Sequence, residues 1–135
     1  MTKREIAHFN MAKAASETSD HRIKMGCAVI SGHKCVSTGC NSLTRCHRVQ
    51  AILDKERFGV DTIGMKHAEV DALLPLIQNG VDLSGASVFV YREHKNGSLA
   101  MSRPCPSCMK LIRKCGIRYI NYTTEDGYAF ETLEV

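Results

Sequence analysis

The chain has 135 residues, of which 44% are hydrophobic and 24% are charged. These values are typical of a globular domain, so we expect one folded unit over residues 1–135. No apolar run approaches the roughly 20 residues that span a bilayer, and no apolar signal core follows the basic start of the chain. We therefore expect a cytoplasmic protein that does not insert into membranes.

The net charge of +4 and the pI near 8.7 favour anionic ligands such as nucleotides. The charge is too small and too evenly spread for a nucleic-acid-binding arm. The seven cysteines are odd in number and mostly scattered. This usage indicates a reducing compartment in which some thiols bind metal, because a chain of this length needs no disulfide scaffold.

The sequence pattern predicts helices alternating with strands. In chain order these are a helix at 2–19, a hairpin of strands at 26–30 and 35–38, a short helix within 51–58, a helix at 67–78, a strand at 87–91, a helix at 106–115, and strands at 117–123 and 128–135. Such an order predicts an α/β sandwich around a mixed sheet. The segment 41–64 is mostly polar, and connections of this length are often functional.

Local signals carry these assignments. Thr2 followed by Glu5 fits a capping box at the start of the first helix. Pro75 is expected to kink the third helix or shorten its last turns. The segment 125–127, Glu-Asp-Gly, is typical of a tight turn, which makes the last strand antiparallel to the one before it.

Two segments at expected helix starts carry metal-ligating residues, His-Ala-Glu at 67–69 and Pro-Cys-Pro-Ser-Cys at 104–108. Cys105 and Cys108 are three apart and share one helix face. With His67 they supply three ligands for Zn²⁺. Three protein ligands and an open fourth position are the pattern of a catalytic zinc site, whereas structural sites close with four.

Glu69 is the candidate proton carrier. Two thiolates and a neutral imidazole cancel the Zn²⁺ charge, so the activated water needs an adjacent base. In the first helical turn Glu69 can reach the same centre as His67. This arrangement predicts attack of water on a carbon that bears an amino group, with Glu69 moving the proton to the ring nitrogen and ammonia leaving.

The pairing of H-x-E with P-C-x-x-C is the signature of zinc deaminases. Over most of positions 20–123 the chain resembles the cytidine and deoxycytidylate deaminase superfamily. Residues 26–30 and 38–41 are similar to the first hairpin of that family, and residues 105–120 to its helix and following strand. The resemblance implies a three-layer α/β/α sandwich around a five-stranded mixed sheet, a Zn²⁺ cofactor and a homo-oligomer.

The resemblance also implies contacts with the substrate. Asn41 would contact the sugar or base, the Ala68 N–H and the Arg103 carbonyl would contact the pyrimidine edge, and Tyr122 would stack on the base. Arg45 and Arg48 follow Asn41 closely and are either phosphate ligands or solvated loop residues.

His67 as the first ligand resembles the deoxycytidylate and nucleic-acid-editing branches, and the segment 108–112 is closest to the deoxycytidylate branch. Asp71, where that branch usually has asparagine, and the shorter chain both depart from the deoxycytidylate branch. The final hairpin points instead toward cytidine deaminases and some bacterial toxin-type deaminases. We expect a free pyrimidine nucleotide as substrate, dCMP or its relatives dCTP and CMP. The alternatives are a nucleic-acid editor, disfavoured by the absence of tryptophan and 6% aromatic content, and a non-catalytic zinc module, disfavoured by Glu69.

Cys40, Cys46 and His47 gather in the long connection. They are candidates for part of a second zinc site. Because no full ligand set is visible there, we prefer to interpret the cysteines as ordinary buried or surface thiols.

Overall fold

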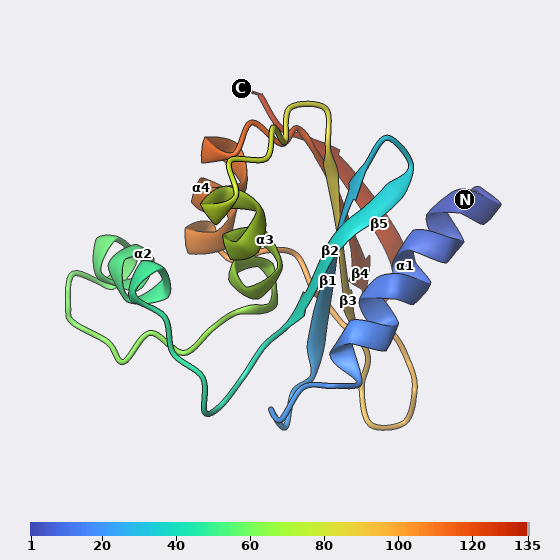
Figure 1. Cartoon of the computed structure of the whole chain (residues 1–135). Helices are drawn as coiled ribbons and strands as arrows, with labels where there is room; N and C mark the ends of the chain where they lie inside the picture. The colour runs from blue at the N-terminus through green and yellow to red at the C-terminus, as the bar shows by residue number, and fades with distance from the viewer. Residues whose placement is uncertain (135) are drawn as a thin grey trace.

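A five-stranded mixed sheet forms the centre of the computed structural model, which describes residues 1–134 (Figure 1). Its strands are β1 (Met25–Ser31), β2 (Lys34–Cys40), β3 (Ser87–Arg92), β4 (Tyr119–Thr124) and β5 (Gly127–Thr132). They lie in the order β2-β1-β3-β4-β5. Strands β3 and β4 are parallel, and the other neighbours are antiparallel. The predicted mixed sheet with an antiparallel last strand is therefore confirmed.

Helices cover both faces of this sheet. They are α1 (Lys3–Ser16), α2 (Arg48–Phe58), α3 (Ala68–Gln78) and α4 (Pro106–Lys114). Figure 1 shows α1 on one face and the other three helices on the opposite face, which gives the three predicted layers. Helix α2 packs on α4 rather than on the sheet. Among the described residues, no helix is both long and apolar enough to cross a bilayer.

The central strands are buried on both faces, so their side chains alternate between two cores. Cys27 and Val29 of β1 belong to the core beneath α3 and α4. Ala28 belongs to the smaller core beneath α1. There the rings of Phe9 and Phe89 meet edge to face at 5.0 Å, a favourable geometry for aromatic pairs. This pattern explains why β1 has an uninterrupted run of apolar residues.

Two glycines allow helices to lie directly on the strands. A Cβ atom at Gly26 would lie 1.9 Å from the carbonyl oxygen of Ala12 in α1. One at Gly39 would lie 2.4 Å from the backbone nitrogen of Ala72 in α3. The second contact matters for function, because α3 begins beside His67.

Several element boundaries differ from the sequence prediction, among them the end of α1 and the start of α2. Helix α1 ends at Ser16 rather than near Ser19, because the Ser19 hydroxyl donates to the Asn41 carbonyl at 2.7 Å instead. Helix α2 begins three residues early because His47 caps it, its Nδ1 accepting from the Val49 N–H at 3.0 Å. Helix α3 continues to Gln78 with Pro75 inside it, so the predicted shortening does not occur, and the alternative of a kink stays a prediction. Pro75 is exposed, and its carbonyl still accepts from the Asn79 N–H.

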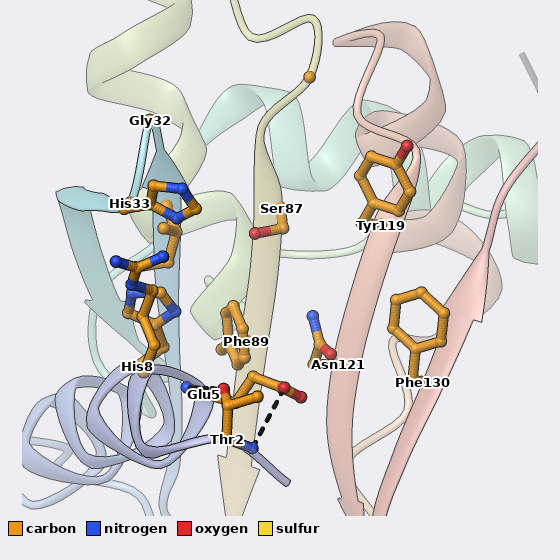
Figure 2. Close-up of a pocket in the computed structure, with 13 residues that line it drawn as sticks. Thr2, Glu5, His8, Gly32, His33, Ser87, Phe89, Tyr119, Asn121 and Phe130 are labelled. Carbon is orange, nitrogen blue, oxygen red and sulfur yellow. Dashed lines mark hydrogen bonds between the residues drawn. The ribbon is translucent and has the colours of Figure 1, made fainter.

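A hollow of about 730 Å³ lies on the α1 side of the sheet (Figure 2). Phe89 and Asn121 point into it from β3 and β4, and the stacked rings of Tyr119 and Phe130 border it. It contains none of the predicted metal ligands. The candidate site therefore lies elsewhere, on the opposite side of the sheet.

Candidate metal centre and active site

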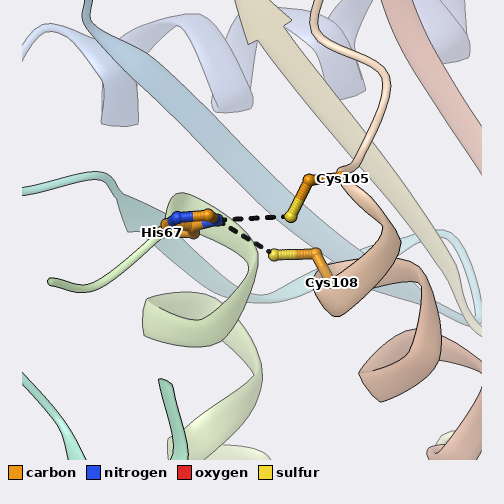
Figure 3. A group of neighbouring side chains, drawn as sticks. All are labelled: His67, Cys105 and Cys108. Carbon is orange, nitrogen blue, oxygen red and sulfur yellow. Dashed lines mark hydrogen bonds between the residues drawn. The ribbon is translucent and has the colours of Figure 1, made fainter. Parts of the chain in front are cut away.

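His67, Cys105 and Cys108 converge from two helix starts, as Figure 3 shows. His67 is the N-cap of α3, Cys105 is the N-cap of α4, and Cys108 lies in the first turn of α4. Neither cap residue uses its side chain to cap its helix. Pro106 occupies the first position of α4, where its missing N–H is not needed. The ligand side chains are therefore free to meet between the two helices.

The geometry of the three residues fits a tetrahedral zinc ion. Their ligand atoms all lie within 4.8 Å of one another. His67 Nδ1 is 3.5 Å from Cys105 Sγ and 3.4 Å from Cys108 Sγ. Zinc bonds of about 2.3 Å to sulfur and 2.0 Å to nitrogen, at tetrahedral angles, separate such atoms by about 3.5 Å. Within residues 1–134 this group has no fourth ligand.

Protonation of the thiols also suits a metal site. Hydrogen bonds with Cys108 and His67 lower the pKa of Cys105 to about 3. The bond with Cys105, together with burial, raises the pKa of Cys108 well above its usual value. Zinc binds cysteine as the thiolate, so a bound dication would displace any proton that remains on the pair. The positive ends of two helices favour the resulting thiolates.

Glu69 is the second residue of α3 and is buried, with 3% of its surface exposed. Burial raises the pKa of its carboxyl group, because the charged form loses its solvation by water. A carboxyl group with a raised pKa can accept and return a proton near neutral pH. Glu69 lines the same pocket as His67 and Cys105, a cavity of about 430 Å³.

The family of the chain follows from its sequence match. Residues 2–124 match the cytidine and deoxycytidylate deaminase zinc-binding region. The chain belongs to this deaminase family. It is therefore a zinc-dependent hydrolase that deaminates pyrimidines, and the His-Cys-Cys cluster fits its Zn²⁺.

Solved structures share the deaminase fold. A cytidine deaminase from Burkholderia pseudomallei is 20% identical, with a TM-score of 0.67, over 98% of this chain and 93% of its own. The dCMP deaminase of cyanophage S-TIM5, in complex with dCMP and dUMP, is 22% identical, with a TM-score of 0.65, over 90% of this chain and 82% of its own. Among curated proteins, none matches the chain significantly in sequence.

Three predicted substrate residues of the deaminase line the 430 Å³ pocket: Asn41, Ala68 and Arg103. The amide of Asn41 is already engaged. Its Oδ1 accepts from the Met25 N–H at 2.9 Å, and its Nδ2 donates to the Ile23 carbonyl at 2.6 Å. Asn41 therefore holds the segment before β1 against the pocket, and its contact with a sugar or base stays a prediction.

Three other predicted residues lie outside the lining of this pocket. Tyr122 is buried in the core beneath α3 and α4, and its hydroxyl donates to Glu131 at 2.7 Å. Arg45 lines a separate hollow bordered by α1, β2 and α3, and it lies 4.0 Å from a carboxylate oxygen of Asp71. Arg48 begins α2. These three side chains therefore do not line the pocket that holds Glu69, and their contacts with substrate stay predictions.

Cys40, Cys46 and His47 do not form a second metal cluster within residues 1–134. Cys40 accepts weak hydrogen bonds from Thr18 and Arg45, and Cys46 contacts the sulfur of Met65. The ring nitrogen of His47 caps α2. None of the seven cysteines forms a disulfide bond.

Sequence reasoning missed the residue that positions His67. Gln50 of α2 is completely buried, and its Oε1 accepts from the His67 N–H at 3.1 Å. Its Nε2 donates to Asp54 at 3.0 Å. A glutamine in a mostly polar connection carries no signal of this role, because the bond joins positions 17 residues apart.

Three further pocket residues were also missed: His21, Lys66 and Arg92. They come from the segment before β1, from the end of the long connection and from the end of β3. Together with Arg103, the side chains of Lys66 and Arg92 make the pocket rim cationic. Glu69 is the only carboxylate among the residues of the described chain that line this pocket.

Proposed function

We propose that this deaminase converts dCMP to dUMP, with dCTP and CMP as related substrates, and that residues 1–135 form one catalytic domain. The observation that carries the proposal is Glu69, buried beside the metal cluster in a pocket whose other charged lining residues are cationic. A pocket of about 430 Å³ suits a single small ligand. The dCMP and dUMP held by the cyanophage neighbour support a nucleotide.

When bound, Zn²⁺ held by His67, Cys105 and Cys108 activates the attacking water as a Lewis acid. Glu69 accepts one proton of the attacking water and delivers it to the ring nitrogen. It then accepts the second proton, from the hydroxyl group now on the ring carbon, and delivers it to the departing amino group. A carbon–oxygen bond forms, the carbon–nitrogen bond breaks, and ammonia leaves. The Ala68 N–H and the Arg103 carbonyl orient the base edge, and Asn41 faces the sugar.

A substrate panel tests this proposal. Zinc-loaded protein is incubated with dCMP, dCTP, CMP, cytidine and a single-stranded DNA oligonucleotide, and ammonia release is recorded. We expect dCMP to have the highest kcat/KM. Glu69→Gln should keep zinc and fold yet lower kcat by at least about 100-fold, because it removes the proton carrier. Glu134→Gln, at an exposed glutamate, is the matched control and should behave as wild type.

Each other result contradicts one part of the proposal. Faster turnover of cytidine than of dCMP removes the nucleotide preference. Reaction with the oligonucleotide alone favours the nucleic-acid editor. No turnover despite bound zinc favours a non-catalytic zinc module, and an active Glu69→Gln variant removes Glu69 from the mechanism.

We also propose that the deaminase is a homo-oligomer. Large apolar side chains lie exposed in the segment after α2 and on β5: 60% of Val60, 72% of Ile63 and 60% of Phe130. Exposed apolar residues of this kind favour protein–protein contact where they gather. Light scattering on the purified protein measures its mass, and a particle of 15.0 kDa, the mass of one chain, contradicts the proposal.

A further inference from the structure

Arg92, the last residue of β3, is held at a fixed place on the pocket rim. It pairs with Met25 across the sheet. Its N–H donates to Thr123 Oγ1 at 3.1 Å, and its carbonyl accepts from the Ala100 N–H at 3.0 Å. The backbone that carries the side chain is therefore anchored on both sides before any ligand binds.

The guanidinium group of Arg92 is incompletely satisfied. One terminal nitrogen, Nη1, donates to the Met101 carbonyl at 3.2 Å. The Nε–H is buried and has no hydrogen-bond partner, and among residues 1–134 it is the only buried side-chain nitrogen or oxygen in this condition. A buried donor without an acceptor costs free energy, and a charged one costs more. The chain itself therefore leaves part of the donor capacity of the Arg92 guanidinium group unused.

The other permanent cations of the pocket already have carboxylate partners. Arg103 binds Glu131 at 2.6 Å, and Lys66 lies 3.4 Å from Asp71. No ion pair within the described part of the chain includes Arg92. The acidic groups near it are also engaged. Glu125 binds His94 at 2.9 Å, and Glu93 accepts from the Tyr91 hydroxyl at 2.6 Å.

We propose that Arg92 binds the phosphate of the substrate and makes this site select a pyrimidine nucleoside monophosphate over the free nucleoside. The inference rests on the proposed function, because it places a nucleotide in the pocket. A planar guanidinium fork donates two parallel N–H groups to phosphate oxygens. This role replaces Arg45 and Arg48, which the sequence suggested and which do not line the pocket.

Binding of the reaction product tests Arg92 without turnover. The affinities of zinc-loaded protein for dUMP and for deoxyuridine are measured by titration calorimetry, for wild type, Arg92→Met and Arg92→Lys. Wild type should bind dUMP more tightly than deoxyuridine. Arg92→Met keeps the apolar stem but removes the charge, so it should weaken dUMP binding about 30-fold or more. Deoxyuridine binding should stay within about twofold of wild type, because the nucleoside has no phosphate.

Two variants control for charge and shape. Arg92→Lys keeps the charge without the fork and should lose less affinity for dUMP than Arg92→Met does. Arg118→Met removes an exposed arginine outside the pocket lining and should match wild type for both ligands. Circular dichroism and zinc content verify that each variant is folded and loaded.

The outcomes separate this inference from the proposed function. Equal losses of dUMP and deoxyuridine affinity, or no loss in Arg92→Met, overturn the phosphate role of Arg92. A wild-type protein that binds both ligands equally also overturns it, even if cytidine is deaminated. Selective loss of dUMP binding by a protein that fails to deaminate dCMP sustains the Arg92 site and contradicts the proposed function.

Discussion

Gln50 links the metal centre to a helix that has no ligand of its own. Its amide joins the His67 backbone to Asp54 of α2, and all of its surface is buried. Residues that orient metal ligands from outside the coordination sphere are often needed for full metal affinity. Gln50 is therefore a positioning residue, which acts on the metal through His67.

Replacing Gln50 with methionine should lower zinc affinity about 10-fold, because the side chain keeps its length but loses both hydrogen bonds. Competition with a chromogenic chelator measures this affinity. Gln78→Met, at an exposed glutamine of α3, is the matched control and should bind zinc as wild type does. If Gln50→Met binds zinc as tightly as wild type does, Gln50 does not position His67 and only fills space in the core.

Glu131 shows how the pocket rim depends on pH. Hydrogen bonds from Arg103 and Tyr122 lower the pKa of its carboxyl group in the folded state. A folded pKa below the unfolded value means that the carboxylate adds stability above the unfolded pKa. That stability is lost as the pH falls through the folded pKa.

Glu131→Gln should therefore lower the free energy of unfolding at pH 7, by no more than about 1 kcal/mol because the ion pair is partly exposed. The difference from wild type should shrink as the pH falls below about 4, where the wild-type group is also neutral. Urea unfolding at several pH values measures it, with Glu134→Gln as the control. A difference that is constant with pH would contradict the ion pair.

At the scale of elements, α3 places the catalytic groups through its close contact with β2. The strand edge is tied to the helix, since the Cys40 N–H donates to Asp71 at 3.0 Å and the Ser37 hydroxyl donates to the Ala72 carbonyl at 2.7 Å. Asp71 also lies within ion-pair distance of Lys66. The aspartate that departs from the deoxycytidylate branch thus ties the long connection, the helix and the strand together.

Gly39→Ala should destabilise the fold by about 2 kcal/mol or more, because its methyl group would enter the backbone of α3 and no rotamer can relieve the overlap. Activity should fall as well, since α3 carries Glu69. Urea unfolding and dCMP turnover measure the two effects. Thr38→Ala, at the preceding exposed position of β2, should cost less than about 1 kcal/mol. Equal stability of the two variants would contradict the close contact.

At the scale of the whole molecule, the metal site joins the starts of α3 and α4. Its ligands His67 and Cys105 are 38 residues apart in the sequence. A ligand that binds only the folded state stabilises it, by about 4 kcal/mol when its concentration is 1,000 times its dissociation constant. The metal centre should therefore contribute to folding as well as to chemistry.

Removal of zinc with a chelator should lower the melting temperature by about 10 °C. Differential scanning calorimetry of the zinc-loaded and stripped protein measures the shift. The variant Cys108→Ser, which lacks one ligand, should melt at the same temperature with and without chelator. An unchanged melting temperature of the wild type would mean that the site does not bind zinc tightly.

The sequence by itself determined the parts of this protein that depend on local patterns. The capping box of α1, the turn before β5 and the spacing of Cys105 and Cys108 each act over a few residues. The family match follows from motifs of the same kind. Only the tertiary structure decided what lines the pocket. The roles of Gln50 and Arg92 depend on contacts between distant segments, and so does the position of Arg45 and Arg48 outside the pocket. A hydrogen bond between distant segments produces no periodic pattern in the sequence.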